Sequence, residues 1–241
     1  MIDLNQVPVT QFTDANTIRL ISTAYIDEPA LQPLADNEDE LSFLEELDGM
    51  TSARQDKGLP LPIGVSSEEL LTDKNGYGWT YVNAAFCYTR ETGNRFNGSE
   101  RGAWYAAWGE NAVRTAQSEV IWHLTRELEA VGVYENITSY RELLAGFTTR
   151  FHDLRELNDD PVFDHDPEIA YAAGQALSRN FLGQGSNGLL YRSARHPEGL
   201  CLAAFRPNLV QNIRQGNTWI FEWSGASIPK ISEAGVEGKI V

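Results

Sequence analysis

The segment from residue 110 to residue 131 constrains the fold more than any other part of this sequence. Its apolar residues recur at spacings of three and four, with charged residues between them: Val113, Ala116, Val120, Leu124 and Leu128. This spacing is typical of an amphipathic helix that packs one side against a core. The sequence therefore predicts a long helix over residues 110–131.

Apolar segments on both sides of this helix predict the strands of a sheet. They are residues 17–22, 147–154, 188–195, 201–205 and 218–223, together with the short aromatic stretch around Tyr105. Residues 167–182 predict a second, Ala-rich helix with Pro167 in its first turn. For the apolar residues 78–89, periodicity does not decide between helix and strand. The pattern indicates an α+β fold with a mixed central sheet flanked by helices.

The first 80 residues are patterned differently from the rest. An acidic helix is predicted near residues 38–47, and a capping box, a pattern that begins helices, opens residues 66–71. We interpret residues 1–80 as an extension that supports a catalytic core at residues 81–241. No internal repeat or long Gly/Ser linker interrupts the sequence, so we expect one compact domain overall.

The net charge of −15 argues against nucleic acid as the main ligand, because duplex binding draws on clustered Lys and Arg. The same charge repels any small anion at long range. A phosphate-binding site in this chain would therefore have to concentrate its arginines locally.

Other sequence features bear on location and on metals. There is no apolar run of about 18 residues and no signal-peptide pattern, so we expect a soluble cytoplasmic protein without membrane contact. Cys87 and Cys201 lie in apolar runs typical of small buried residues rather than of disulfides or metal ligands. His152 and Asp153 are adjacent in a predicted strand and point to opposite faces, so we expect no metal site there.

Residues 93–119 place three chemically versatile side chains on successive elements. Arg95 follows a Gly-Asn turn, Tyr105 lies in an aromatic strand, and Glu119 lies on the predicted helix beside its apolar stripe. A carboxylate at such a position has to pair, take up a proton or face a cavity. Together the three residues suggest a site for a phosphate-bearing ligand.

Several blocks of this sequence match one family in order. They are RLIST, NRFNGSERGAWYAAW, TAQSEVIWH, SNGLLYRSARHPEGLCLAAFRP and WIFEWSG, from about residue 18 to residue 225. The chain resembles the RES-domain family, bacterial toxins paired with Xre-type helix-turn-helix antitoxins. The resemblance implies a fold similar to ADP-ribosyltransferase domains and cleavage of the nicotinamide–ribose bond of NAD. It implies phosphate as the acceptor in some members, and water or a protein in others.

The resemblance also implies a set of site residues. The family's Arg, Tyr, Glu and Ser fall on Arg95, Tyr105, Glu119 and Ser193, and Arg19 matches an N-terminal family arginine. The chain departs from the family pattern at two positions, Ser22 and Arg192, where the family usually has Pro. Arg192 would add a charge near the site.

The residue types suit this chemistry. Breaking this glycosidic bond develops positive charge on the ribose, while the leaving pyridine is already cationic and needs no general acid. Glu119 would bind the ribose hydroxyls and stabilise that charge. Arg19 and Arg95 would clamp the pyrophosphate or an incoming phosphate. Tyr105 would stack on or hold the nicotinamide, and Ser193 would bind the phosphate or a ribose hydroxyl rather than act as a nucleophile.

Each assignment has a structural alternative. The two arginines also fit surface or strand-edge positions, Tyr105 fits an aromatic core, and Ser193 fits a hydrogen-bonded strand hydroxyl. His123, one turn after Glu119, suits a structural role better than a catalytic base. The alternative functions are an ADP-ribosyltransferase acting on a protein and a catalytically silent partner of a DNA-binding regulator. A homodimer is a further expectation, and no cofactor is expected beyond NAD as substrate and inorganic phosphate as co-substrate.

Overall fold

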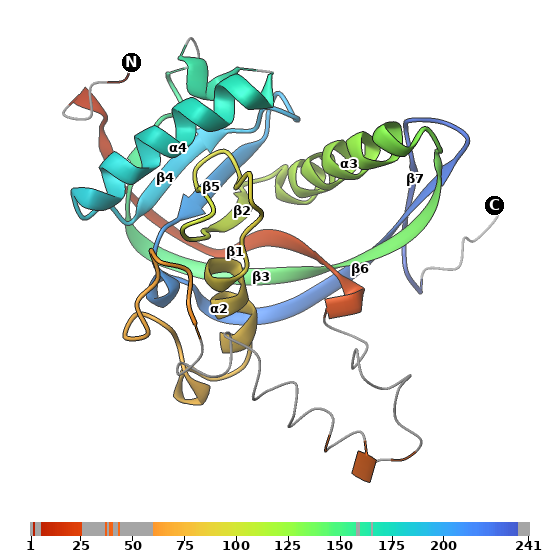
Figure 1. Cartoon of the computed structure of the whole chain (residues 1–241), viewed down its shortest axis with the longest axis horizontal. Coiled ribbons are helices and arrows are strands. Elements are labelled where there is room, and N and C mark those ends of the chain that lie inside the picture. Colours follow the sequence, from red (N-terminus) through yellow and green to blue (C-terminus); the bar gives the residue numbers. More distant parts are fainter. Residues whose placement is uncertain are drawn as a thin grey trace.

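Seven strands and three α-helices form the part of the chain that the computed structural model describes (Figure 1), namely residues 2, 6–25, 37, 39–40, 43, 60–157, 160–164 and 166–235. The strands are β1 (Val9–Ser22), β2 (Trp104–Trp108), β3 (Glu135–Asp153), β4 (Gly188–Arg192), β5 (Leu200–Ala204), β6 (Gln211–Ser224) and β7 (Lys230–Glu233). The helices are α2 (Trp79–Cys87), α3 (Ala112–Val131) and α4 (Pro167–Gly183). The predicted α+β fold with a mixed sheet is confirmed.

The sheet closes on itself through its first strand. The strand order is β1-β2-β5-β4-β3-β6-β7, and β1 also pairs with β3. All pairs are antiparallel except β3 with β4. Strand β3 is long enough to pair with β6 over its first part and to meet β4 at His152 and Asp153. A strand from the predicted N-terminal extension therefore completes a closed cycle of five strands.

The two faces of the sheet pack against different helices. In β5, Leu202 and Ala204 face the hydrophobic core that contains Val82 and Phe86 of α2. The alternate residues Cys201 and Ala203 face the core that contains Phe181 of α4. Helix α3 packs on β1 and β2. Figure 1 shows α4 and α3 above the sheet, apart from each other, with α2 below them.

Local sequence explains where the helices begin and end. Helix α3 begins two residues later than predicted and ends at Gly132, whose φ of 75° is left-handed. The Asp166 side chain caps α4 by accepting a hydrogen bond from Glu168 N at 2.9 Å, and Pro167 follows as predicted. The apolar segment that periodicity left undecided forms α2.

Other predictions about the elements need correction. Strands β1, β3 and β6 extend well beyond the predicted residues because they pair with one another along most of their length. Residues 66–71 form turns instead of a helix: Glu69 accepts a hydrogen bond from Ser66 N at 2.9 Å, but the chain then turns at once. The predicted acidic helix at residues 38–47 lies largely outside the described residues. Within them, no helix is long and apolar enough to cross a membrane.

Candidate active site

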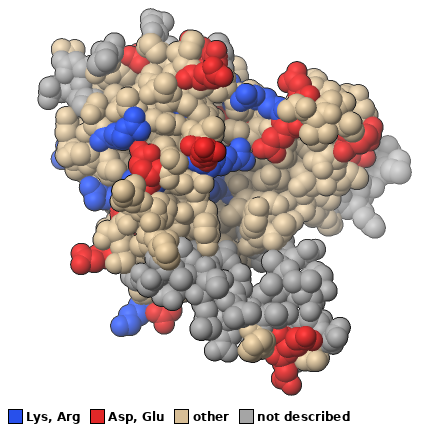
Figure 2. All heavy atoms as spheres, in the orientation of Figure 1, with Lys and Arg blue, Asp and Glu red and all other residues tan. Residues whose placement is uncertain are grey.

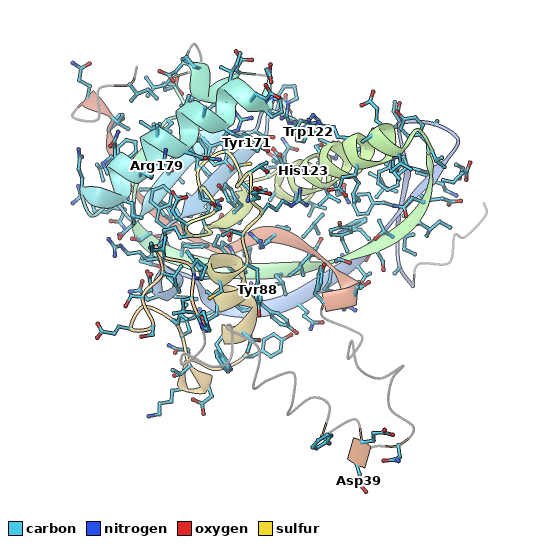
Figure 3. The ribbon with its side chains drawn as sticks, in the orientation of Figure 1. Asp39, Tyr88, Trp122, His123, Tyr171 and Arg179 are labelled. Carbon is cyan, nitrogen blue, oxygen red and sulfur yellow. The ribbon has the colours of Figure 1, made fainter. Side chains whose placement is uncertain are left out.

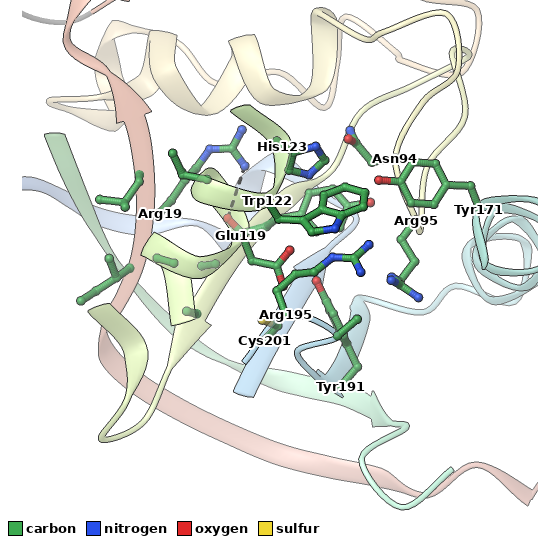
Figure 4. Close-up of a pocket in the computed structure, with 18 residues that line it drawn as sticks. Arg19, Asn94, Arg95, Glu119, Trp122, His123, Tyr171, Tyr191, Arg195 and Cys201 are labelled. Carbon is green, nitrogen blue, oxygen red and sulfur yellow. Dashed lines mark hydrogen bonds between the residues drawn. The ribbon is translucent and has the colours of Figure 1, made fainter. Parts of the chain in front are cut away.

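A cavity of about 240 Å³ lies on the face of the sheet that α3 and α4 cover. Its chemically active lining comes from several elements: Arg19, Arg95, Tyr105, Glu119, Trp122, His123, Tyr171 and Arg195. Figure 2 shows cationic side chains at a hollow near the middle of the visible surface of the molecule, with acidic ones scattered around it. Four of the five residues predicted from sequence therefore meet at one cavity (Figure 4).

Arg19 reaches the cavity from β1. Its Nη1 donates a hydrogen bond to the backbone oxygen of Tyr105 at 3.3 Å, and its guanidinium lies 5.0 Å from the centroid of the Trp104 ring. Burial lowers the pKa of Arg19 to about 10, so the guanidinium remains charged at neutral pH.

Helix α4 holds the turn that carries Arg95. The side-chain amide of Gln175 donates to the backbone oxygens of Thr92 at 2.9 Å and Asn94 at 3.0 Å. Arg95 itself is only 9% exposed, and its Nη1 donates to the carbonyl oxygen of Val162. Its carbonyl oxygen packs so closely on Gly174 of α4 that a Cβ there would overlap it. The position of the Arg95 guanidinium thus depends on α4.

The Tyr105 hydroxyl fixes the same turn from the sheet. It accepts a hydrogen bond from Phe96 N at 3.0 Å and donates one to Asn97 Oδ1 at 2.8 Å. Burial raises the pKa of Tyr105 well above its ordinary value, so the phenol is neutral. The ring lines the cavity, while the hydroxyl is committed to the turn.

Ser193 orients the Glu119 carboxylate. The Ser193 hydroxyl donates to Glu119 Oε1 at 2.6 Å and accepts from the backbone N–H groups of Arg195 at 3.0 Å and His196 at 3.1 Å. Ser193 is buried and does not itself line the cavity. Among the described residues, no hydrogen bond reaches Glu119 Oε2. That oxygen is therefore available to a ligand.

The cavity carries an excess of positive charge. Arg19, Arg95 and Arg195 line it beside a single carboxylate, Glu119. None of the three arginines forms an ion pair with a residue that the structure describes. A chain of net charge −15 thus concentrates unpaired guanidinium groups at one place, as an anion site in such a chain requires.

Sequence reasoning left several residues of the cavity outside the predicted site, although it considered His123 and gave it a structural role. Trp122 and His123 follow Glu119 by three and four residues on α3, and Tyr171 faces them from α4 (Figure 3). Helical spacing from Glu119 indicated His123 and also fits Trp122, but the place of Tyr171 depends on where α4 lies relative to α3. Burial, together with Arg90, Arg195 and Arg126, lowers the pKa of His123 to about 4. His123 is therefore neutral at pH 7.

Arg195 is the most prominent residue that sequence reasoning missed. Its guanidinium lies 3.5 Å from the centroid of the Trp122 ring. Burial lowers its pKa, and Glu119 opposes this effect. By contrast, Arg192 does not line the cavity: it donates to the carbonyl oxygen of Arg155 at 2.9 Å and pairs with Glu156. The charge that Arg192 adds next to Ser193 is therefore paired with Glu156 and does not line the cavity.

The cysteines and the histidine–aspartate pair lie in structural surroundings. Cys87 and Cys201 are buried and form no disulfide within the described residues, as the apolar runs predict, and burial raises the pKa of Cys87 to about 11. His152 contacts Ser186 Oγ at 2.8 Å, whereas Asp153 binds Arg155. Over the described ranges of the chain, no group of three potential metal ligands occurs.

Comparison with known protein families identifies the family of this chain. The family model described as RES domain matches residues 73–224, which is more than half of the chain. The chain belongs to the RES-domain family. The match includes Arg95, Tyr105, Glu119 and Ser193, whereas Arg19 on β1 precedes it. A search of curated proteins found no match.

Proposed function

We propose that this chain is a cytoplasmic, toxin-type enzyme that degrades NAD by cleaving the nicotinamide–ribose bond. Membership of the RES-domain family supports an enzyme that acts on NAD. The observation that carries the proposal is the cavity itself, in which Glu119 stands among three unpaired guanidinium groups. Such a site favours a ligand that is anionic at one part and develops positive charge at another.

The anionic part of the ligand is the pyrophosphate. Arg19 and Arg95 approach the cavity from β1 and from the turn before β2, and a guanidinium binds phosphate oxygens in pairs. The cavity, at about 240 Å³, is smaller than most small-molecule sites, which span ~300–1,000 Å³. We therefore expect the cavity to hold the nicotinamide–ribose half of NAD, while the rest of the dinucleotide extends out of the cavity.

Glu119 acts at the ribose. In the reaction, the bond between the ribose carbon and the pyridine nitrogen breaks, and its electron pair leaves with neutral nicotinamide. An acceptor oxygen forms the new bond to that carbon and releases its proton to solvent. The free Oε2 of Glu119 would bind a ribose hydroxyl and stabilise the cationic transition state, while Ser193 holds Oε1. Neutral His123 adds no positive charge against that transition state.

The acceptor and the partners are parts of this proposal. Inorganic phosphate would make the chain an NAD phosphorylase, and water would make it a glycohydrolase. A protein acceptor would make it an ADP-ribosyltransferase. We further propose an Xre-type antitoxin that covers the cavity, as the family resemblance implies, and a homodimer, with the first 80 residues as a surface for either contact.

Expression in a bacterial host tests this function. We expect the chain to arrest growth and to deplete cellular NAD, because each turnover destroys the dinucleotide. Glu119→Gln should relieve both effects. The matched control is Glu129→Gln, an equivalent change at an exposed position of the same helix, which should leave the arrest intact. Normal growth and normal NAD at good expression of the folded wild-type chain would favour the catalytically silent alternative.

A further inference from the structure

We propose that Arg195, stacked on Trp122 beside Glu119, forms a separate anion subsite that binds inorganic phosphate as the acceptor. The proposal rests on the proposed function and adds to it the residue that selects phosphate over water. Neither residue belongs to the set that the sequence predicted, and both line the cavity.

The stacking fixes Arg195 while leaving its hydrogen-bonding edge free. The guanidinium lies 3.5 Å from the centroid of the Trp122 ring, a distance that places it over the face of the indole. The Arg195 side chain donates no hydrogen bond and forms no ion pair within the described residues. Its N–H groups are therefore preorganised and unused, which is the state of an arginine that awaits an oxyanion.

Charge around Arg195 also favours an anion. Arg95 and Arg126 act on it with like charge, and Glu119 is the carboxylate that opposes them. Arg195 is half-buried, so water compensates this repulsion less than it would at an open surface. A phosphate bound at this position removes the imbalance, whereas a neutral water molecule does not.

The subsite is distinct from the Arg95 position. Arg95 is anchored at the carbonyl of Val162 and against α4. Arg195, in contrast, follows β4 and lies next to Glu119, as Figure 4 shows. The Ser193 hydroxyl links Glu119 to the backbone of Arg195, because it donates to Glu119 Oε1 and accepts from Arg195 N. A phosphate on Arg195 therefore stands at a fixed position relative to the ribose that Glu119 binds.

Steady-state kinetics of the purified full chain tests this subsite. Nicotinamide release is measured while phosphate and NAD are varied in turn, for wild type, Arg195→Gln and the matched control Arg192→Gln. We expect Arg195→Gln to raise the KM for phosphate about tenfold or more, as the loss of one charged hydrogen bond predicts. The KM for NAD should rise far less than the KM for phosphate, and Arg192→Gln should match wild type throughout.

Two results would overturn the proposal. An equal rise in the KM for NAD would place Arg195 in the grip on the dinucleotide, and an unchanged KM for phosphate would remove the subsite. If Arg195→Gln does not fold, Arg195→Lys replaces it: a lysine keeps the charge but cannot present a planar fork on Trp122, so the KM for phosphate should still rise.

Direct binding separates this proposal from the proposed function. Titration calorimetry with inorganic phosphate alone, without NAD, should show binding to wild type and to Arg192→Gln, and weakening of about tenfold or more in Arg195→Gln. This result supports the subsite even if the chain proves not to consume NAD. Equal phosphate binding by all three proteins, or none by wild type, would contradict it.

Discussion

Gly174→Ala, a change on α4, should displace Arg95. The added Cβ would come closer to the carbonyl oxygen of Arg95 than real Cβ atoms come to any backbone atom, and would lie 3.1 Å from its carbonyl carbon. Because this neighbour is backbone, the turn or the helix has to move. Such overpacking costs about 1–3 kcal/mol, and the better helix propensity of Ala offsets about 1 kcal/mol of it.

A second glycine of the same helix provides the control. A Cβ at Gly183, the last residue of α4, meets no atom within 4 Å. Gly183→Ala should therefore be neutral or slightly stabilising, and Gly174→Ala should be less stable than wild type by about 1 kcal/mol, or about 2–4 °C in Tm. Thermal unfolding measures this difference.

The same pair of variants links α4 to binding. Titration of NAD into Glu119→Gln backgrounds, in which turnover is blocked, should show about tenfold weaker binding for Gly174→Ala, because Arg95 loses its position. Gly183→Ala should bind as its parent does. Equal stability and equal affinity of the two variants would refute the conclusion that α4 positions Arg95.

Three further changes test the surroundings of the site. Tyr105→Phe leaves the buried Phe96 N–H unpaired and removes one of the two hydrogen bonds to Asn97 Oδ1. It should therefore lower the unfolding free energy by about 1–3 kcal/mol in urea denaturation, whereas the exposed Tyr25→Phe should not. Ser193→Ala should lower kcat more than it raises the KM for NAD, because it frees the Glu119 carboxylate. The folded pKa of His123, about 4, lies below its unfolded value of 6.5, so the unfolded chain takes up a proton first as the pH falls. The free energy of unfolding should therefore be unaffected by His123 above pH 6.5 and should decrease by about 2–3 kcal/mol as the pH drops toward 4. His123→Gln should remove this part of the pH dependence.

The positions of the helices with one apolar side could be predicted from local sequence. The stripe on α3 placed its start within two residues, and Pro167 marked the first turn of α4. Helix α2 was not decidable because it is short and buries both apolar and polar residues, including Asn83, whose amide binds the backbone of Leu71. The lengths of β1 and β3 depend on their pairing with each other, which no local pattern records.

The residues of the site also fall into those that the sequence could predict and those that require the packed structure. Arg95, Tyr105 and Glu119 lie within 25 residues on three successive elements, so their meeting could be anticipated from the sequence. Arg195 and Tyr171 reach the cavity only because α4 and the loop after β4 fold back toward α3. Their contribution requires the packed structure, since their spacing in sequence from Glu119 carries no geometric information.

The most direct test of the account is to identify the products that the purified chain makes from NAD, with and without inorganic phosphate. Mass spectrometry distinguishes phosphorylated ADP-ribose from free ADP-ribose, and nicotinamide reports cleavage itself. The account predicts phosphate-dependent release of nicotinamide together with a phosphorylated ADP-ribose, and loss of both in Glu119→Gln. Intact NAD after incubation with folded wild-type protein under both conditions, or full activity of Glu119→Gln, would contradict it.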